Sequence, residues 1–332
     1  MSKTLLVTGG AGYVGSHCCK AFSAAGWNVV VYDNLSRGWR EFVRWGDLIV
    51  GDVRDLGSLN AAMQRVKPAA VAHFAALAYV GESVTDPAEY YRTNVLGTMN
   101  LLDAMRAAGV GRLVFSSTCA TYGIPAAVPI TESMPQNPIN PYGRTKLVAE
   151  GMLRDYDAAY GIKSVALRYF NAAGADPEGM VGERHEPETH ALPLILRAAA
   201  PDSDHTFRVF GSDYDTEDGT CVRDYVHVQD LASAHLKALE FLERNDTSAV
   251  FNLGRGNGVS VRAMIAMVES YSNRRVRHEY APRRPGDPDT LVADSTLARD
   301  VLGWVPERSG MVDIVADAWR WAELEANRRN NG

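Results

Sequence analysis

The sequence contains few cysteines, and their arrangement excludes two common kinds of site. Four occur in 332 residues: Cys18 and Cys19 are adjacent, while Cys119 and Cys221 stand alone. This spacing fits neither a disulfide framework nor a zinc motif, so we expect no disulfide scaffold and no metal. Cysteine usage of this kind is typical of a reducing, cytoplasmic setting.

Long apolar runs and an excess of basic charge are also missing. The apolar runs fall far short of the roughly 18 residues that a membrane-spanning helix needs. The net charge is −6, from 34 basic and 40 acidic side chains, which gives no electrostatic attraction to nucleic acid or an anionic membrane. The first residues read as a strand rather than a signal peptide. We therefore expect no nucleic-acid and no membrane partner.

A glycine-rich stretch follows the first expected strand. Lys3–Thr8 is a short apolar run typical of a buried parallel strand, and a helical pattern comes after the glycines. Gly10, Gly12 and Gly15 fit G-x-G-x-x-G, while Gly9, Gly12 and Gly15 fit the related G-x-x-G-x-x-G. Such glycines allow a tight turn and let a pyrophosphate approach the N-terminus of the helix.

The second expected strand, Asn28–Asp33, ends in an acid. Asp33 lies about 20 residues past the glycines, where a carboxylate binds the adenosine ribose of a dinucleotide. A carboxylate there repels a 2′-phosphate, so the pattern favours NAD over NADP, although the nearby Arg37 weakens this exclusion. The sequence therefore predicts an NAD-binding βαβ unit.

Strands and helices continue to alternate, which predicts an α/β fold with a Rossmann-type doubly wound parallel sheet. Ligands of such sheets lie at the C-terminal ends of the strands. Asp52 is at such an end and is a candidate for the adenine amino group, whereas His73 has apolar neighbours and is expected to be a packed core residue. The further strands that we expect are Leu48–Asp52, Val71–Ala75 and Arg112–Ser117, with helices from a cap at Asp55 to Val66 and from Asp86 to Ala108.

Tyr142 and Lys146 lie about one turn apart on the helix that follows Pro138–Pro141. A phenol has an unperturbed pKa of about 10, and we expect the ammonium to lower it. The pair can then remove a proton from an alcohol and return one to a ketone. Thr118, at a strand end 24 residues earlier, is placed to donate to a substrate oxygen beside the phenol. An isolated pair of this spacing is usually a surface feature, so the dinucleotide pattern upstream favours the catalytic interpretation.

Regular alternation is lost beyond about residue 173, which predicts a smaller substrate-binding cap. A helix from Val228 to Glu243 and a strand at Ala249–Leu253 are expected to return to the sheet. Helices near Val261–Tyr271 and Met311–Ala326 complete the cap. The expected division is discontinuous: 1–172 plus about 226–256 for the NAD-binding domain, and about 173–225 plus 257–332 for the cap.

These motifs together resemble the extended short-chain dehydrogenase/reductase superfamily, and further stretches resemble its UDP-glucose (galactose) 4-epimerase family from Met1 to about Trp321. The superfamily resemblance rests on Thr8–Gly15, Asp33–Leu35, Asp52, His73–Ala76, Ser116–Thr118, Tyr142, Gly143 and Lys146. The narrower one rests on Val80–Val84, Arg168–Asn171, Thr216–Thr220, Val222–His227 and Arg283–Asp287.

The resemblance implies an NAD-dependent cycle without net redox change. Tyr142 removes the proton of the sugar 4-hydroxyl, C4 is oxidised to a ketone, the keto sugar turns, and C4 is reduced from the other face. Lys146 is implied to bond the nicotinamide ribose, and Thr118 to bond the sugar O4. A homodimer is implied as well, through the helices Asp86–Ala108 and Asn140–Tyr160.

The resemblance also assigns binding residues, position by position. The cofactor contacts carried over are Gly9, Gly12, Tyr13, Val14, Gly15, Asp33, Asn34, Leu35, Ser36, Arg37, Gly38, Asp52, Val53, Phe74, Ala75, Ala76, Asn94, Ser116, Tyr142, Lys146 and Phe170. The UDP-sugar contacts carried over are Thr118, Tyr142, Asn171, His190, Ala191, Arg208, Val209, Phe210, Arg223, Arg284, Asp287 and Leu291. Among these, Arg223 and Arg284 suit a diphosphate, because guanidinium forks form bidentate hydrogen bonds.

Several alternatives stay open at the level of the sequence. Ala78 replaces a lysine that touches the NAD pyrophosphate in some relatives, which predicts at most a weaker grip on the cofactor. Leu291 is intermediate in bulk at a position that gates N-acetylated sugars, and the chain also resembles UDP-xylose/UDP-arabinose 4-epimerases. A nucleotide-sugar dehydratase needs an acid–base pair where Cys119 and Ala120 stand, and a non-catalytic NAD-binding protein is expected to lack Tyr142 or Lys146.

Overall fold

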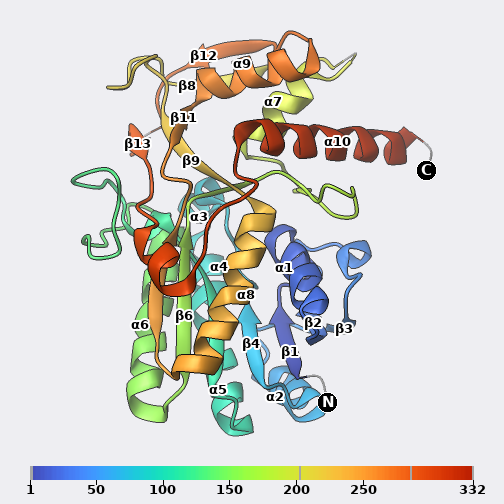
Figure 1. Ribbon diagram of the computed structural model, residues 1–332, viewed down its shortest axis with the longest axis vertical. Coiled ribbons are helices and arrows are strands. Elements are labelled where there is room, and N and C mark those ends of the chain that lie inside the picture. The colour runs from blue at the N-terminus through green and yellow to red at the C-terminus, as the bar shows by residue number, and fades with distance from the viewer. Residues whose placement is uncertain (1–2, 202, 285, 331–332) are drawn as a thin grey trace.

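The computed structural model describes residues 3–201, 203–284 and 286–330, with side chains described as far as residue 328. Pro285, at the centre of the Arg283–Asp287 motif, lies outside the described residues. A parallel sheet flanked by helices forms the lower part of the molecule in Figure 1, and a smaller group of strands and helices lies above it. None of the described helices combines the length and the apolar character needed to cross a membrane.

Seven parallel strands form the main sheet in the order β10-β6-β5-β4-β1-β2-β3. The strand order reverses between β1 and β4, and ligands of doubly wound sheets bind at that point. The predicted Rossmann-type sheet is confirmed, including the return of the last strand to its edge. The strands are β1 (Thr4–Thr8), β2 (Asn28–Asp33), β3 (Asp47–Val50), β4 (Ala70–His73), β5 (Arg112–Thr118), β6 (Lys163–Tyr169) and β10 (Ala249–Leu253).

Helices cover both faces of this sheet (Figure 1). Alternate residues of β1 point to opposite sides: Leu5 and Val7 join the core cluster that includes α8, and Leu6 joins the one that includes α2 and α5. All three are fully buried, and such burial contributes about 1.5–3 kcal/mol per side chain. One face carries α1 (Tyr13–Ala24) and α8 (Val228–Asn245), and the other carries α2 (Leu56–Val66), α5 (Gly97–Ala108) and α6 (Pro141–Tyr160).

The helix that carries Tyr142 has well-defined ends. Asn140 accepts a hydrogen bond from the backbone N–H of Gly143 at 2.8 Å, which satisfies one of the free donors of the first turn. Pro141 occupies the first helical position, where its missing N–H has no cost. The helix ends at Gly161 with a φ of +70°, a left-handed conformation that glycine adopts freely.

The predicted helix from Asp86 to Ala108 is present, but it contains a π-helical turn. Asp86 caps α4 (Pro87–Tyr90), and the π-turn η2 (Tyr91–Leu96) leads into α5. Apolar periodicity does not reveal the extra residue of such a turn, which occurs most often at functional sites. Here the turn carries Asn94, whose side chain is buried.

The cap is built around β9 (Val222–His227). This strand pairs in parallel with β7 (Asn171–Ala173) and β13 (Thr290–Leu291), and antiparallel with β11 (Gly258–Ser260). A separate pair joins β8 (Phe207–Phe210) to β12 (His278–Ala281). The cap helices pack together through a core that includes Ile195, Met264 and Ile314, and they are α7 (Ala191–Ala199), α9 (Val261–Ser272) and α10 (Met311–Asn330).

Some of the chain expected in the cap packs against the NAD-binding part. Ala298 and Leu302 of the π-turn η4 (Ala298–Leu302), together with Trp304, join the core cluster of α8 and the main sheet. The indole Nε1 of Trp304 donates to the backbone oxygen of Asp230 at 2.8 Å. The remaining short helices are α3 (Val80–Thr85), η1 (Arg40–Phe42) and η3 (Cys119–Thr121).

Candidate active site

The glycine loop passes closely against its neighbours at the end of β1. A Cβ on Gly9 would lie 2.4 Å from the backbone N of Ala75, and one on Gly15 would lie 2.3 Å from the oxygen of Gly9. Gly9 also has a φ of +75°, so a larger residue would be strained there. A Cβ on Gly12 would meet only the oxygen of Gly9, at 3.4 Å, so this glycine leaves room in front of the N-terminus of α1. The loop is thus a cradle that fits a pyrophosphate.

Asp33 orders the loop that follows β2. Its carboxylate accepts hydrogen bonds from the backbone N–H groups of Ala11 at 3.0 Å and Leu35 at 2.8 Å. Burial raises the pKa of this carboxyl, and the two backbone donors oppose the rise. Gly38 lies so close to Ala11 that a Cβ would be 2.9 Å from its carbonyl carbon. The acid at the adenosine end of the site is therefore held against the glycine loop.

Asp52 and Arg37, two more predicted cofactor residues, are held by protein partners. Asp52 pairs with Arg54 at 2.7 Å and accepts from Asn34 at 2.9 Å, and the Arg54 hydrogen bonds hold the pKa of that carboxyl well below its usual range. Arg37 pairs with Glu82 at 2.5 Å and lies over the Tyr79 ring. Beside them is a cavity of about 220 Å³, lined by Asn34, Ser36, Arg37, Arg54, Leu77, Glu82, Asp86, Glu89, Tyr90 and Thr93.

The end of β4 is fastened to the end of β1 and to α5. Phe74 and Ala75 both donate their backbone N–H to the oxygen of Thr8, at 2.8 and 3.1 Å. His73 is buried between the hydroxyls of Thr8 and Thr98, and burial lowers its pKa to about 3. This confirms that His73 is a core residue.

Asn94 acts as a clamp within this region. Its amide nitrogen donates to the backbone oxygen of Leu77 at 2.9 Å and to the hydroxyl of Thr145 at 3.0 Å. Its amide oxygen accepts from the backbone N–H of Leu77 at 2.8 Å. The π-turn therefore fixes the segment after β4 relative to the helix of Tyr142 and Lys146, which the sequence pattern did not predict.

Thr118, Tyr142 and Lys146 come together at the C-terminal end of β5. The Thr118 hydroxyl lies close enough to the Tyr142 phenol to oppose the rise in the phenol's pKa. Lys146 is buried and donates to the backbone oxygen of Ser116 at 2.8 Å. Next to it, the Ser116 hydroxyl is hydrogen-bonded to the phenol of Tyr169. The structure thus assembles a threonine, a tyrosine and a lysine around one strand end, as the sequence predicted for this fold.

The pKa values of this site differ from the sequence-based expectation. Burial raises the pKa of Tyr142 to about 12, and the hydrogen bond with Thr118 opposes the rise. Burial lowers the pKa of Lys146 to about 7, and the charge of Glu150 opposes that fall. In this arrangement of side chains the expected fall in the tyrosine pKa is not found, because burial of the phenol outweighs the opposing effect of Thr118, while burial of Lys146 lowers the pKa of the lysine itself.

Glu150 is a part of the site that the sequence analysis missed. It lies one turn beyond Lys146 on α6, and its side chain pairs with Arg168 at 2.6 Å while accepting from Ser117 at 2.5 Å. The signal for it was present, since positions 142, 146 and 150 follow one face of a helix. The sequence analysis named its partner Arg168 only within the Arg168–Asn171 motif and gave it no role in the site.

The predicted substrate residues of the cap lie on several elements near β9. Arg223 on β9 is buried and pairs with Asp287 at 2.5 Å, and Leu291 is its register partner on β13. The Arg284 guanidinium lies 4.1 Å from the centre of the Phe210 ring. Of the other predicted substrate residues, Val209 is buried, and Arg208 is exposed and pairs with Glu279. Asn171 begins β7, His190 directly precedes α7, and Ala191 begins α7.

Leu291 also connects the cap to the catalytic strand end. It packs against the buried cluster that contains Cys119 and Phe170. Cys119 directly follows Thr118, and Phe170 directly precedes Asn171. The bulk at position 291 therefore lies near residues that are adjacent in sequence to Thr118 and Asn171.

Comparison with known proteins identifies the family. Residues 5–254 match the model of the NAD dependent epimerase/dehydratase family. This chain belongs to that family. A UDP-glucose 4-epimerase of Rhizobium leguminosarum bv. trifolii is 54% identical over 319 residues, covering 96% of this chain and 97% of the relative. The predicted resemblance to the 4-epimerases is confirmed.

Solved structures agree with this family membership. The crystal structure of the Brucella ovis UDP-glucose 4-epimerase in complex with NAD has a TM-score of 0.94 at 50% identity, covering 97% of this chain and 99% of that chain. The Bifidobacterium longum UDP-glucose 4-epimerase, in complex with NAD⁺ and UDP, has a TM-score of 0.92 at 35% identity, covering 98% of this chain and 99% of that chain.

Proposed function

We propose that this chain interconverts UDP-glucose and UDP-galactose by NAD-dependent epimerisation at C4. The observation that carries this proposal is that Thr118, Tyr142 and the buried Lys146 meet at the end of β5, at the same sheet edge as the glycine cradle. Relatives that are 50–54% identical over nearly the whole chain are UDP-glucose 4-epimerases. This supports epimerisation of UDP-hexoses over epimerisation of UDP-pentoses.

The residues present fit a bound NAD. The glycine cradle and the N-terminus of α1 suit the pyrophosphate, Asp33 the adenosine ribose, and the cavity next to Asp52 and Arg37 the adenosine end. Lys146 and Ser116 lie at the nicotinamide end in this arrangement. When bound, NAD accepts a hydride from the sugar C4 and returns it, and its oxidised ring adds a positive charge to the site.

The protein's own side chains move and hold protons. Tyr142 takes the proton of the sugar 4-hydroxyl as C4 becomes a ketone, and it returns that proton to O4 after the sugar has turned. Thr118, beside the phenol, is placed to hold O4 while its charge changes. A cation near the phenol favours the phenolate. Lys146 has a pKa of about 7, so the protonated fraction of this side chain supplies such a charge near neutral pH.

The cap residues are proposed to hold the UDP part. Arg223 and Arg284 suit the diphosphate, and Asp287 orients Arg223 through its ion pair. The β8 strand offers Arg208, Val209 and Phe210 to the uracil. The sugar is proposed to lie near Asn171, His190, Ala191 and Leu291.

The proposal is tested with purified protein and no added NAD⁺. UDP-galactose, UDP-xylose and UDP-N-acetylglucosamine are supplied separately, and the 4-epimer of each is followed by NMR. We expect UDP-galactose to be turned over fastest. A strong preference for UDP-xylose would move the assignment to a pentose epimerase, and one for UDP-N-acetylglucosamine would make the hexosamine the substrate. No turnover even with NAD⁺ supplied would refute the epimerase assignment.

We also propose that the protein works as a homodimer in cytoplasmic galactose metabolism. Two neighbouring segments, η2–α5 and α6, carry apolar side chains that are partly open to solvent: Leu96 is 40% exposed, Met99 39% and Val148 43%. A second copy that packs against these helices would cover them in a four-helix arrangement. All four cysteines are free thiols, as expected in a reducing compartment.

A further inference from the structure

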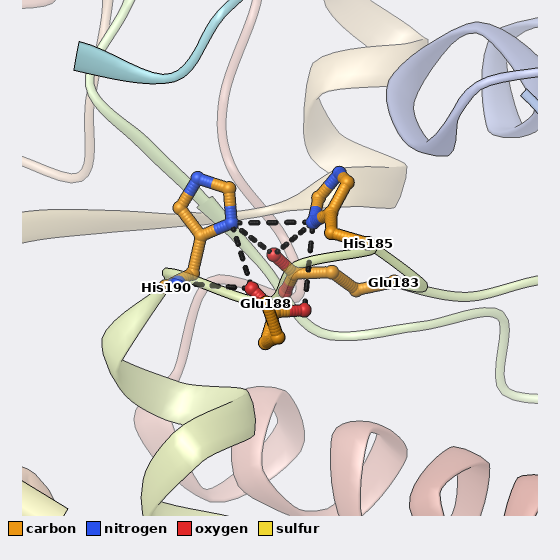
Figure 2. Close-up of side chains that lie close together, drawn as sticks. All are labelled: Glu183, His185, Glu188 and His190. Carbon is orange, nitrogen blue, oxygen red and sulfur yellow. Dashed lines mark hydrogen bonds and ion pairs between the residues drawn. The ribbon is translucent and has the colours of Figure 1, made fainter. Parts of the chain in front are cut away.

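Four potential metal ligands converge in the loop that leads into α7. Glu183, His185, Glu188 and His190 point their side chains at a common centre, with the two imidazole rings facing each other over the two carboxylates (Figure 2). The ligand atoms all lie within 4.8 Å of one another. The function proposed above assigns substrate contact to His190 and does not use the other three.

The separations between these atoms match the edges of a small coordination polyhedron. The Nδ1 atoms of His185 and His190 are 3.3 Å apart. Glu183 Oε1 lies 3.3 Å from His185 Nδ1 and 2.7 Å from His190 Nδ1. Glu188 adds Oε2 at 3.5 Å from His185 and Oε1 at 3.3 Å from His190. Tetrahedral zinc with ligands at 2.0–2.1 Å separates its donor atoms by about 3.3 Å.

The surroundings hold these ligands in place. Glu188 Oε1 accepts hydrogen bonds from the backbone N–H groups of Thr189 at 2.8 Å and His190 at 2.9 Å. His185 packs edge-on against the rings of Tyr13 and Tyr79. Partners of this kind orient metal ligands and raise affinity, because less side-chain freedom is lost when the ion binds.

We propose that Glu183, His185, Glu188 and His190 form a binding site for one divalent transition-metal ion, Zn²⁺ being the best match. Zn²⁺ takes both imidazole nitrogens and carboxylate oxygens, whereas Mg²⁺ and Ca²⁺ prefer oxygen ligands alone, so the two imidazoles favour Zn²⁺. Four protein ligands leave no open position, so the site is structural rather than catalytic. The sequence-based expectation of no metal considered cysteine spacing, and this set contains no cysteine.

Protons are the alternative occupants of the same geometry. Two protonated imidazoles would neutralise the two carboxylates as completely as one Zn²⁺ does. However, the two Nδ1 atoms are 3.3 Å apart, within hydrogen-bond distance, so they can share a proton only where one imidazole is neutral, and one carboxylate charge is then left without a counter-charge. A divalent ion between the nitrogens neutralises both carboxylates and satisfies all four ligands together.

An ion here would fix the cap loop against the NAD-binding part of the molecule. Tyr13 belongs to α1 and Tyr79 precedes α3, so the site lies where the loop meets the elements that carry the glycine cradle. His190 directly precedes α7. Metal binding is therefore expected to stabilise the folded chain as a whole.

The test is a titration of chelator-treated, full-length protein with ZnCl₂ by calorimetry, repeated with CoCl₂ to read coordination from the visible spectrum. We expect one equivalent to bind, a tetrahedral cobalt spectrum, and a rise in the thermal midpoint. The variant His185→Ala should bind at least about 100-fold more weakly, since even outer partners of metal ligands are worth about 10–100-fold. Glu183→Gln, which keeps the side-chain shape, should also weaken binding and serves if His185→Ala does not fold.

Two control variants address other ligands. His278→Ala removes an exposed histidine of β12, and Cys221→Ser removes the one cysteine that is not fully buried; both should bind like the wild type. The absence of one-to-one binding would mean that the cluster is an ion-pair network only and would overturn the proposal. Unchanged binding by both His185→Ala and Glu183→Gln would overturn it as well. Neither readout depends on epimerase activity.

Discussion

At the scale of single residues, the proposed chemistry depends on the hydroxyl of Tyr142. Tyr142→Phe removes the proton carrier and keeps the ring, so we expect kcat for UDP-galactose to fall by about 10²–10⁴-fold. The thermal midpoint should change little. Tyr160→Phe, at an exposed tyrosine of the same helix, is the matched control and should keep full activity in the NMR assay. A Tyr142→Phe enzyme with more than a tenth of wild-type kcat would show that another group carries the proton.

Lys146 should leave a signature in the pH dependence of stability. Its folded-state pKa is about 7, while a lysine in the unfolded chain titrates near 10.4. Between these two pKa values the unfolded chain binds a proton that the folded chain does not. The contribution of Lys146 to the free energy of unfolding therefore rises with pH, by up to about 1.4 kcal/mol per pH unit. The burial cost of the charge is present in full below pH 7.

The variant Lys146→Met removes this titration and should also lose activity. Urea denaturation at pH 7 and pH 9 measures the difference in unfolding free energy between wild type and variant. We expect this difference to move in favour of the wild type as the pH rises, whereas Lys3→Met, at an exposed lysine, should show no comparable trend. A difference that stays constant or moves the other way would contradict the depressed lysine pKa.

The identities of the site residues were readable from the sequence, but their electrostatics were not. Spacing alone placed Tyr142 and Lys146 on one face of a helix, and motif context predicted Thr118 beside them. The pKa values depend on how deeply each group is buried, which is a property of the assembled fold. For that reason the expected fall in the tyrosine pKa became a rise. The sequence also did not predict that Glu183, His185, Glu188 and His190 converge, because this too depends on the assembled fold.

At the scale of secondary-structure elements, one buried ion pair joins α6 to the sheet. Arg168 on β6 contacts both carboxylate oxygens of Glu150, at 2.9 and 2.6 Å, and the two side chains are 5% and 1% exposed. Arg168 also donates to the Tyr122 phenol at 2.8 Å, which in turn donates to Asn252 on β10 at 2.7 Å. Removing one partner leaves the other charge buried and unpaired.

We therefore expect Glu150→Ala to reduce the unfolding free energy by about 3–5 kcal/mol. The control is Glu178→Ala, which breaks an ion pair with Lys20 at a carboxylate that is 73% exposed and should cost less than about 1 kcal/mol. Urea denaturation at neutral pH measures both. A loss below about 1 kcal/mol for Glu150→Ala would mean that Arg168 finds another partner or water.

The predicted helix boundaries agree closely with the structure where apolar periodicity defines the helix. The predicted cap at Asp55 is confirmed, since it accepts from the backbone N–H of Ser58 at 3.0 Å. The predicted helix beginning at Val228 runs two residues past Glu243. The π-turn at Tyr91–Leu96 was not predicted, because one extra residue in a turn leaves the apolar pattern almost unchanged.

At the scale of the whole molecule, local patterns predicted the main sheet better than the cap. Parallel strands buried on both faces have a distinctive apolar run, whereas the cap strands are as short as β13 (Thr290–Leu291) and pair across long stretches of sequence. The parallel pairing of β7 with β9 is an example that no local signal indicates. Dimer formation is harder still to predict from local patterns, because it depends on how exposed surfaces of two chains fit together.

The last prediction concerns the interface of the proposed dimer. Leu96 and Met99 lie on one exposed side of η2–α5, and burying a charge there on association would cost several times the thermal energy unless it finds a partner. The double variant Leu96→Glu, Met99→Glu should weaken dimerisation by at least about 100-fold, roughly 2.7 kcal/mol. Sedimentation velocity at micromolar concentration should then give a monomer, against a dimer for the wild type.

Val312→Glu is the matched control for this surface, because Val312 is an apolar residue of α10 that is 76% exposed on the cap. It adds the same charge away from the predicted interface, so the dimer should persist. A wild-type monomer would refute the interface directly. A double variant that remains dimeric would place the contact elsewhere, and loss of the dimer in Val312→Glu would point to α10. Thr118, Tyr142 and Lys146 meet within a single chain, so monomeric variants should keep these residues in place. Any loss of activity would then measure how far the partner stabilises α6.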